Sequence, residues 1–441
     1  MLTQVQNTVK GNFVTNNEDI QEILEALRIK EERELYHYLR DTLSVDVINP
    51  IIYKKENTKE DTLLNFVNGN FLKISENFGP HIYDTCMDVV ASLGLEHLPL
   101  DFYLEINPVL NAYAYHNYKT DEPHFIVFTS GLIDNLDMDE LRVVIGHELA
   151  HIIYHHYEIS RVIDMIFAPD NNISDRFLYN LYLLWVELAQ MSADRLGLLV
   201  VYDFDAAVRA NFKISTGLTM NKMNTTTKHY IKMMGKVIEE LKRQNNTYAM
   251  NYHPSQPVRT KALETFFNSS TRSYFIEKRQ YMEDTNLIDE TSKLIEKLQI
   301  RPKNEIENAE FEFLLSSGYL IMTAEDGWDA YKNMCLLDLL SWYHIDPRDI
   351  IKDAIDNRKV SDLFENSLSL IKEQNKSDTS YLYSMLTDLI ARDNKIREKE
   401  VSILIDIANE LGIPEEKAID MILESLRKNY KPSIIMDRVT K

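Results

Sequence analysis

Hydrophobic residues recur every three or four positions along most of this chain, which is the spacing of helices that bury one face. Before residue 275, the ranges with this pattern are 17–46, 62–93, 137–152, 174–201 and 206–245. Two short runs rich in aromatic and β-branched residues, 101–106 and 124–128, predict β-strands instead. The Asn-Pro pair and the charged stretch within 49–60 predict a linker.

After about residue 275 the strand pattern is lost, and charged and apolar residues alternate at helical spacing to the end of the chain. Residues 393–428 predict two short helices, because Gly412 can end the first in the left-handed conformation and Pro414 can open the second. With 441 residues, only 12 glycines and 12 prolines, the chain is long enough for two or three domains and favours helices. The predicted fold class is α+β, mostly helical, with a small sheet.

The charge balance narrows the possible partners. The net charge is −21, whereas nucleic-acid binders usually carry a basic surface, so we expect no nucleic-acid ligand. Cys86 and Cys335 are the only cysteines and cannot build a disulfide framework, which suits a reducing cytoplasm. No signal peptide and no apolar run of transmembrane length are visible, so we expect no transmembrane segment and a cytoplasmic location.

The strongest chemical signal lies in the predicted helix 137–152, which Asp137 and Glu140 can start as a capping box. His147 and His151 are four residues apart and therefore lie one turn apart on the same helical face, where two imidazoles can bind one metal ion. Glu148 follows His147 and can act as the general base on a zinc-bound water. A surface helix can match this pattern by chance, but the position after a strand and within an apolar frame favours a metal site.

The surroundings of this motif resemble peptidase family M48, a group of zinc metallopeptidases, over about residues 60–270. Four segments match in order: Asn111, Ala112, Tyr113 and Ala114; Ile126–Leu132; His147–His151; and Ser192–Leu199. A fifth is His253-Pro254 followed by Arg259. The resemblance implies a zincin-like fold, zinc as cofactor and a peptide or protein substrate.

The resemblance also implies roles for individual residues. Asn111 to Ala114 would form an edge strand that lines the substrate. Asp194 would orient a ligating histidine, His253 would stabilise the developing oxyanion, and Arg259 would support the site.

The third metal ligand departs from the family pattern. The family has a glutamate four residues before the aspartate at position 194, and this chain has Gln190 there. A neutral amide oxygen is a poorer zinc ligand than a carboxylate. Three interpretations stay open: Gln190 binds weakly, Glu187 one turn earlier completes the site, or the site is impaired.

Other histidines have less specific interpretations. His155 and His156 follow the motif by one turn and are expected to flank the site rather than to ligate. His116 and His124 border the expected substrate strand and are expected to have loop and strand-edge roles.

The chain is thus expected to comprise a helical segment 1–60, an M48-like metallopeptidase domain 61–272 and a helical domain 273–441. Part of the last, about 310–441, faintly resembles TerB-like domains at residues 324–327 and 393–396 and at Glu400, where plain helix capping is the simpler interpretation. The expected function is zinc-dependent peptide hydrolysis, as in metalloendopeptidases. The alternative is a catalytically impaired pseudopeptidase that acts as a protein-binding or scaffold module.

Overall fold

The computed structural model describes residues 17–56, 63–117, 122–167, 176–244, 255–325, 327–373, 379–392 and 396–431. The described residues divide into two compact units. The first lies within Met1–Asn172, Leu184–Glu240 and Asn251–Lys297, and the second within Ile173–Leu183, Leu241–Met250 and Leu298–Lys441. The predicted class, mostly helical α+β, is confirmed.

The first unit carries the sheet and the helices around it. Its elements up to the middle of the chain are α1 (Asn17–Ala26), α2 (Lys30–Thr42), α3 (Val45–Glu56), α4 (Leu63–Asn70), β1 (Leu72–Ile74), α5 (Pro80–Ser92), β2 (Leu100–Glu105), β3 (Ala112–Tyr115), β4 (His124–Thr129), α6 (Ser130–Asn135), α7 (Met138–Ile153), α8 (His156–Val162) and the π-helix η1 (Ile163–Phe167). Then follow α9 (Arg176–Leu199), α10 (Phe204–Thr216), α11 (Thr227–Gln244), α12 (Gln256–Phe267), α13 (Ser270–Lys278) and α14 (Thr285–Ile295). The first residues of α9 and the last of α11 belong to the second unit.

The sheet has four strands in the order β1-β2-β4-β3. β2 and β4 are parallel, and β1 and β3 add antiparallel at the two edges. Successive side chains of a strand point to opposite faces. On β4, Ile126 and Phe128 therefore join the main core with α5 and α7, while Phe125 and Val127 form a smaller core with Val67 of α4.

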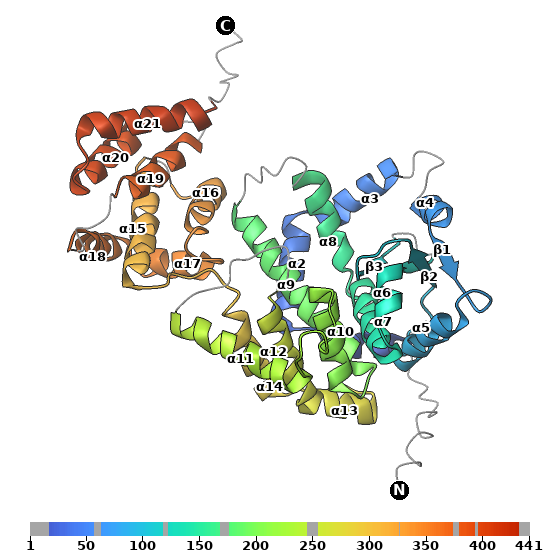
Figure 1. Ribbon diagram of the computed structural model, residues 1–441. Coiled ribbons are helices and arrows are strands. Elements are labelled where there is room, and N and C mark those ends of the chain that lie inside the picture. The colour runs from blue at the N-terminus through green and yellow to red at the C-terminus, as the bar shows by residue number, and fades with distance from the viewer. Residues whose placement is uncertain are drawn as a thin grey trace. The chain divides into compact units, whose positions relative to one another are not determined.

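The edge strand β3 follows the same alternation. Its register pairs Ala112 with Phe128 and Ala114 with Ile126, so both alanines lie on the face that α7 covers. Figure 1 shows α7 beside the sheet. Because β3 ends the strand order, one of its backbone edges has no strand partner among the described residues.

The helix α7 is fixed at its start and along its side. Asp137 and Glu140 form the predicted capping box, and Lys213 of α10 binds the Glu140 carboxylate at 2.6 Å. In its middle, Gly146 lies against Gly197 of α9, and a Cβ on Gly197 would come within 2.7 Å of the Val143 carbonyl oxygen. The absence of these two Cβ atoms allows α9 to approach α7 closely.

The second unit is a helical bundle. Its helices are α15 (Glu305–Met322), α16 (Ala330–Leu340), α17 (Arg348–Asp356), α18 (Val360–Glu373), α19 (Ser380–Arg392), α20 (Glu398–Glu410) and α21 (Glu415–Asn429), and α15 contacts α16, α18, α19 and α20. Gly412 has a φ of +71° between the last two helices, as predicted. Glu400 caps α20 through the backbone of Arg397; Asp326 and residues 393–395 lie outside the described residues.

Two sequence predictions of local structure are wrong. Residues 62–93 are not helical throughout, because β1 lies between α4 and α5, and α5 begins after Gly79, at a φ of +74°, with Pro80 in its first turn. The predicted linker 49–60 begins inside α3, although Pro50 lies in that helix, and the buried Asn49 side chain donates a hydrogen bond to the Glu158 carbonyl of α8. Residues 206–245 are largely helical, as predicted, and form two helices, α10 and α11, of which the first ends at Gly217 with a φ of +70°.

Within the described residues, no helix combines the length and the apolar character needed to span a membrane.

Candidate functional site

The Nε2 atoms of the two motif histidines, His147 and His151, lie close together. The Nε2 atoms of His147 and His151 lie 3.1 Å apart, one turn apart on α7. Each ring has its Nδ1 atom engaged elsewhere, so both Nε2 lone pairs remain available for a shared ligand. This arrangement suits a metal ion bound through Nε2.

The outer nitrogen of His147 contacts a buried ion pair. Its Nδ1 lies 3.0 Å from Asp194 Oδ1, and Arg259 of α12 binds the same carboxylate through Nε at 2.8 Å and Nη2 at 2.6 Å. Burial alone would raise the pKa of Asp194, but Arg259 and His147 outweigh it and lower the pKa to about 2. The ionised Asp194 can accept the Nδ1–H of His147 and fix the tautomer that presents Nε2 as a ligand.

The outer nitrogen of His151 contacts another histidine. Its Nδ1 lies 2.8 Å from Nδ1 of His156, and Nε2 of His156 lies 3.4 Å from Glu32 Oε1, which is long for a hydrogen bond. If His151 keeps its Nε2 lone pair for a metal, its Nδ1–H must donate to His156. His156 then carries its proton on Nε2, towards the Glu32 carboxylate.

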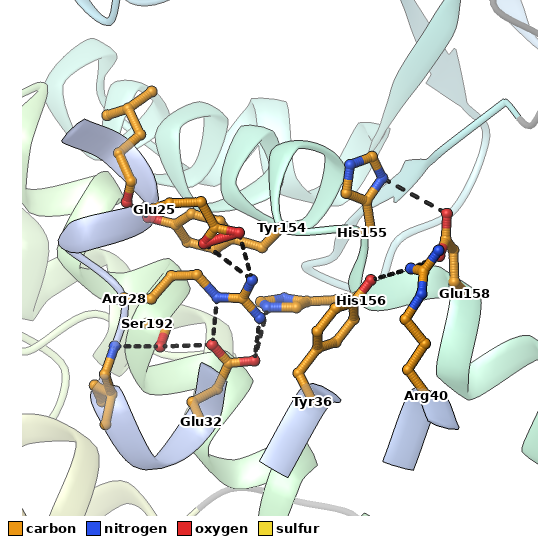
Figure 2. A network of polar contacts seen from close by, with 12 residues as sticks. Glu25, Arg28, Glu32, Tyr36, Arg40, Tyr154, His155, His156, Glu158 and Ser192 are labelled. Atoms are coloured by element: carbon orange, nitrogen blue, oxygen red, sulfur yellow. Dashed lines mark hydrogen bonds and ion pairs between the residues drawn. The ribbon is translucent and has the colours of Figure 1, made fainter. Parts of the chain in front are cut away.

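Glu32 itself is held by a buried network, shown in Figure 2. Arg28 donates to both of its oxygens, at 2.6 and 2.7 Å, and Trp185 Nε1 donates to Oε1 at 2.9 Å. Burial would raise the pKa of Glu32, but His156 and Arg28 lower it to about 2. Helix α2 thus places a negative charge beside the histidine that supports His151.

The two candidates for the third ligand occupy different positions. The side-chain amide of Gln190 lies 3.3 Å from His151 Nε2, and a 180° flip of the amide exchanges its nitrogen and oxygen at this place. Glu187 instead accepts a hydrogen bond of 2.9 Å from the backbone N–H of Ser255, just before α12. Burial raises the pKa of Glu187 to about 7, although the Ser255 N–H and Arg259 act in the opposite direction.

A cavity of about 600 Å³ opens over these groups. Its lining includes the motif residues His147, Glu148 and His151, together with Gln190, Arg259 and the substrate-strand candidates Asn111, Ala112, Tyr113 and Ala114. Glu148 is almost fully buried, and burial raises the pKa of its carboxyl group, with His147 and a backbone hydrogen bond at Ala114 opposing the shift. The structure therefore places the candidate base between the histidine pair and the edge strand.

One predicted site residue, His253, lies outside the described residues, as does Pro254. All other predicted site residues line the cavity except Asp194 and Glu187. Asp194 contacts His147, which does line it.

Sequence reasoning did not find the supporting roles of His156, Glu32 and Arg28. The position of His156, five residues after His151, was the one sequence signal near the motif. Glu32 is more than a hundred residues away along the chain, so nothing in the local sequence pointed to it.

Comparisons with known proteins match the same region. Residues 80–169 match the sequence model of peptidase family M48. Two curated proteins named "Protease HtpX homolog", from Tropheryma whipplei strains Twist and TW08/27, are each 31% identical over 107 residues, which cover 24% of this chain and 35% of the relative.

The chain thus spans about a third of the length of these relatives. No solved structure matches. The matched family region contains the sheet strands β2, β3 and β4 and all of α7 and α8, which carry the histidine pair and its glutamate. Residues 80–169 of this chain are therefore similar to peptidase family M48.

Proposed function

We propose that this chain hydrolyses peptide bonds with a zinc ion held by His147, His151 and Gln190 and with Glu148 as the general base. The observation that carries the proposal is the convergence of the two Nε2 atoms, 3.1 Å apart, in a cavity that also contains Glu148 and the edge strand β3. The M48 match over these residues supports a peptidase.

The donor set fits zinc. Two neutral imidazoles are common zinc ligands, the Gln190 amide oxygen would serve as a weaker third ligand in place of the usual carboxylate, and catalytic sites keep a further position open for water. Burial holds the pKa of His151 well below its usual value, so its imidazole is neutral and available as a ligand. A bound zinc ion lowers the pKa of a coordinated water towards neutrality and polarises a carbonyl group. Glu187 is not proposed as a ligand, because its carboxylate accepts the Ser255 N–H.

Glu148 carries the proton transfers. A carboxylate with a raised pKa is a stronger base than an exposed one, so Glu148 can take a proton from the attacking water. The same carboxyl group can then give this proton to the leaving amine. Burial of the side chain keeps competing water away from the carboxylate.

The substrate would bind as an extra strand along β3. In the described part of the chain, the opposite edge of Ala112–Tyr115 has no strand partner, so an extended peptide could bind there, with main-chain hydrogen bonds supplying affinity. Ala112 and Ala114 are small and face the α7 side, so a peptide backbone could approach Glu148 without a steric barrier from these residues. This geometry favours cleavage within an extended peptide, as an endopeptidase requires.

His253 is proposed to stabilise the oxyanion, on the basis of the sequence resemblance. It precedes Ser255 by two residues and is therefore within about 7 Å of it along the chain. Ser255 contacts Glu187, and Arg259 four residues later binds Asp194. These two contacts hold the segment that follows His253 against the site.

A mixture of unstructured peptides tests the proposal. Zinc-loaded protein should release new peptides detected by mass spectrometry, and Glu148→Gln should lower the rate about 10²–10⁴-fold. Glu76→Gln, at an exposed position, is the matched control and should leave the rate unchanged. Equal rates for the wild type and Glu148→Gln, or no cleavage by zinc-loaded protein, would refute the proposal.

The second candidate function is a protein-binding pseudopeptidase, and Gln190 is the observation that favours it. Gln190→Glu restores the family's carboxylate and separates the two functions. If only this variant cleaves the peptide mixture, the natural chain is a binding module. If both chains cleave it, the natural site is an active peptidase with a weak third ligand.

A further inference from the structure

A second group of metal-ligating side chains lies outside the proposed peptidase site. His116 follows β3, His155 occupies the corner between α7 and α8, and Glu158 lies in α8. One donor atom from each residue lies within 4.8 Å of the others. The closest pair is His155 Nδ1 and His116 Nε2, at 3.0 Å, and Glu158 Oε1 is 3.7 Å from His155 Nδ1.

The spacing of these atoms resembles that of the motif histidines. Two nitrogens that ligate one tetrahedral zinc ion at 2.0–2.1 Å are about 3.3 Å apart. The pair His116 and His155 is separated by 3.0 Å, and the pair His147 and His151 by 3.1 Å. Both pairs therefore need little movement to share a metal ion.

Neighbouring groups hold the ligand side chains in place. The His124 ring stacks on His116 with 4.5 Å between ring centroids, and the Asn117 N–H donates to His124 Nδ1 at 2.9 Å. Arg40 binds the second carboxylate oxygen of Glu158 at 2.5 Å and leaves Oε1 directed towards His155 (Figure 2). The hydrogen bond from Arg40 to Glu158 is of the kind that orients carboxylate ligands in metal sites.

The charges around the group also suit a cation. Arg40 is paired with Asp46 as well as with Glu158, so its positive charge is balanced by two carboxylates. Burial, with smaller contributions from His155 and His124, lowers the pKa of His116 to about 3 and keeps its ring neutral. Neutral imidazole is the form that binds metal ions.

Two of the three residues, His116 and His155, line a cavity outside the proposed peptidase site. A space of about 200 Å³ is lined by His116, His124 and His155 and by apolar residues such as Leu24 and Ile152. The cavity over Glu148 has none of these residues in its lining. A metal ion bound here would therefore reach solvent by a route different from that of the peptidase site.

We propose that His116, His155 and Glu158 form a second site for a divalent cation of the zinc class. Nitrogen and carboxylate donors select such ions over magnesium or calcium, which prefer oxygen ligands. The ion would tie the connection after β3 to the corner between α7 and α8. Because His156, which supports His151, begins α8, a bound ion would hold this corner in place. The proposal does not depend on peptidase activity.

Zinc titration of the full-length, metal-free chain tests the second site in a His147→Gln/His151→Gln background that removes the motif ligands. We expect this background to bind about one zinc ion per chain, and a further His116→Gln or His155→Gln change to weaken this binding at least about tenfold. His81→Gln, at an exposed histidine, should leave it unchanged. The proposal would be overturned if the background bound no zinc, or if His116→Gln and His155→Gln left zinc binding as strong as His81→Gln does.

Chemical modification of the wild-type protein provides a second test, which does not depend on whether any substituted protein folds. His155 has a side chain 46% exposed, and diethyl pyrocarbonate should modify it in the metal-free protein. Two equivalents of zinc should protect His155, whereas His81 should react equally with and without zinc. Unchanged modification of His155 in the zinc-loaded protein would contradict the proposal. Failure of the peptidase proposal alone would leave both results for this site unaffected.

Discussion

The buried carboxylate of Glu32 provides a sharp test of how α2 supports the site. Glu32→Gln keeps the size of the side chain and an oxygen for the Trp185 N–H, but removes the negative charge that Arg28 and His156 face. The Glu32 side chain is fully buried and that of Arg28 is 1% exposed. The substitution therefore leaves a guanidinium group in the interior with only part of its neutralising charge.

The expected effect follows from this burial. Removing one partner of a buried ion pair costs about 3–5 kcal/mol of unfolding free energy. Arg28 keeps two hydrogen bonds to Glu25, whose side chain is 42% exposed, so we expect the lower end, about 3 kcal/mol. His156 also loses the negative charge that favours a proton on its Nε2, so we expect zinc affinity at the motif to fall about 10–100-fold.

Glu34→Gln, in the same helix, is the matched control. Glu34 and Lys30 form a pair of 3.8 Å in which both side chains are 63% exposed, worth about 0.3–0.5 kcal/mol. Urea unfolding can be followed by Trp185 fluorescence, with Trp328 and Trp342 replaced by phenylalanine in every chain. Zinc affinity is measured by competition with a chelator. Equal unfolding midpoints and equal zinc affinities for the two variants would refute the supporting role of Glu32.

Four further outcomes follow from the same contacts. Gln190→Glu should raise zinc affinity at least about tenfold in the same chelator competition, and unchanged affinity would argue against Gln190 as a ligand. Asp194→Asn should weaken zinc binding about 10–100-fold, and an unchanged dissociation constant would contradict its orienting role. Gly197→Ala should cost about 1–3 kcal/mol in urea unfolding, since its Cβ would lie 2.7 Å from the Val143 carbonyl oxygen, and a neutral effect would show that α9 can shift. Asp194 and Glu32 have pKa values of about 2 in the folded protein, against usual values of 3.8 and 4.5. Their contribution to the stability of the fold is therefore complete above pH 4.5 and is lost as the pH falls towards 2. A urea unfolding midpoint that stays constant from about pH 5 to about pH 2.5 would contradict this.

Local sequence signals predicted the elements that carry the candidate chemistry. The capping box at Asp137 and Glu140 and the spacing of His147 and His151 both depend on residues within one or two helical turns. Gly412 also acts locally, through a left-handed cap between two helices. Such features could be predicted because neighbouring residues alone determine them.

Features that depend on distant contacts were not predicted. β1 pairs with β2 across about 30 residues, and its three residues are too short for a visible alternation. Pro50 suggested a linker, but packing of α3 against α8 outweighs its local preference. The support of His151 by His156 and Glu32 requires α2 and α8 to lie together, and no periodicity within either helix reports this.

The proposed peptidase site depends first on zinc binding by the motif histidines. The most direct measurement is calorimetric zinc titration of the metal-free chain carrying His116→Gln and His155→Gln, which leaves the motif as the site under test. We expect one zinc ion per chain, and loss of this binding when His147→Gln is added. Zinc binding that is equal with and without His147, or absent from both chains, would contradict the claim.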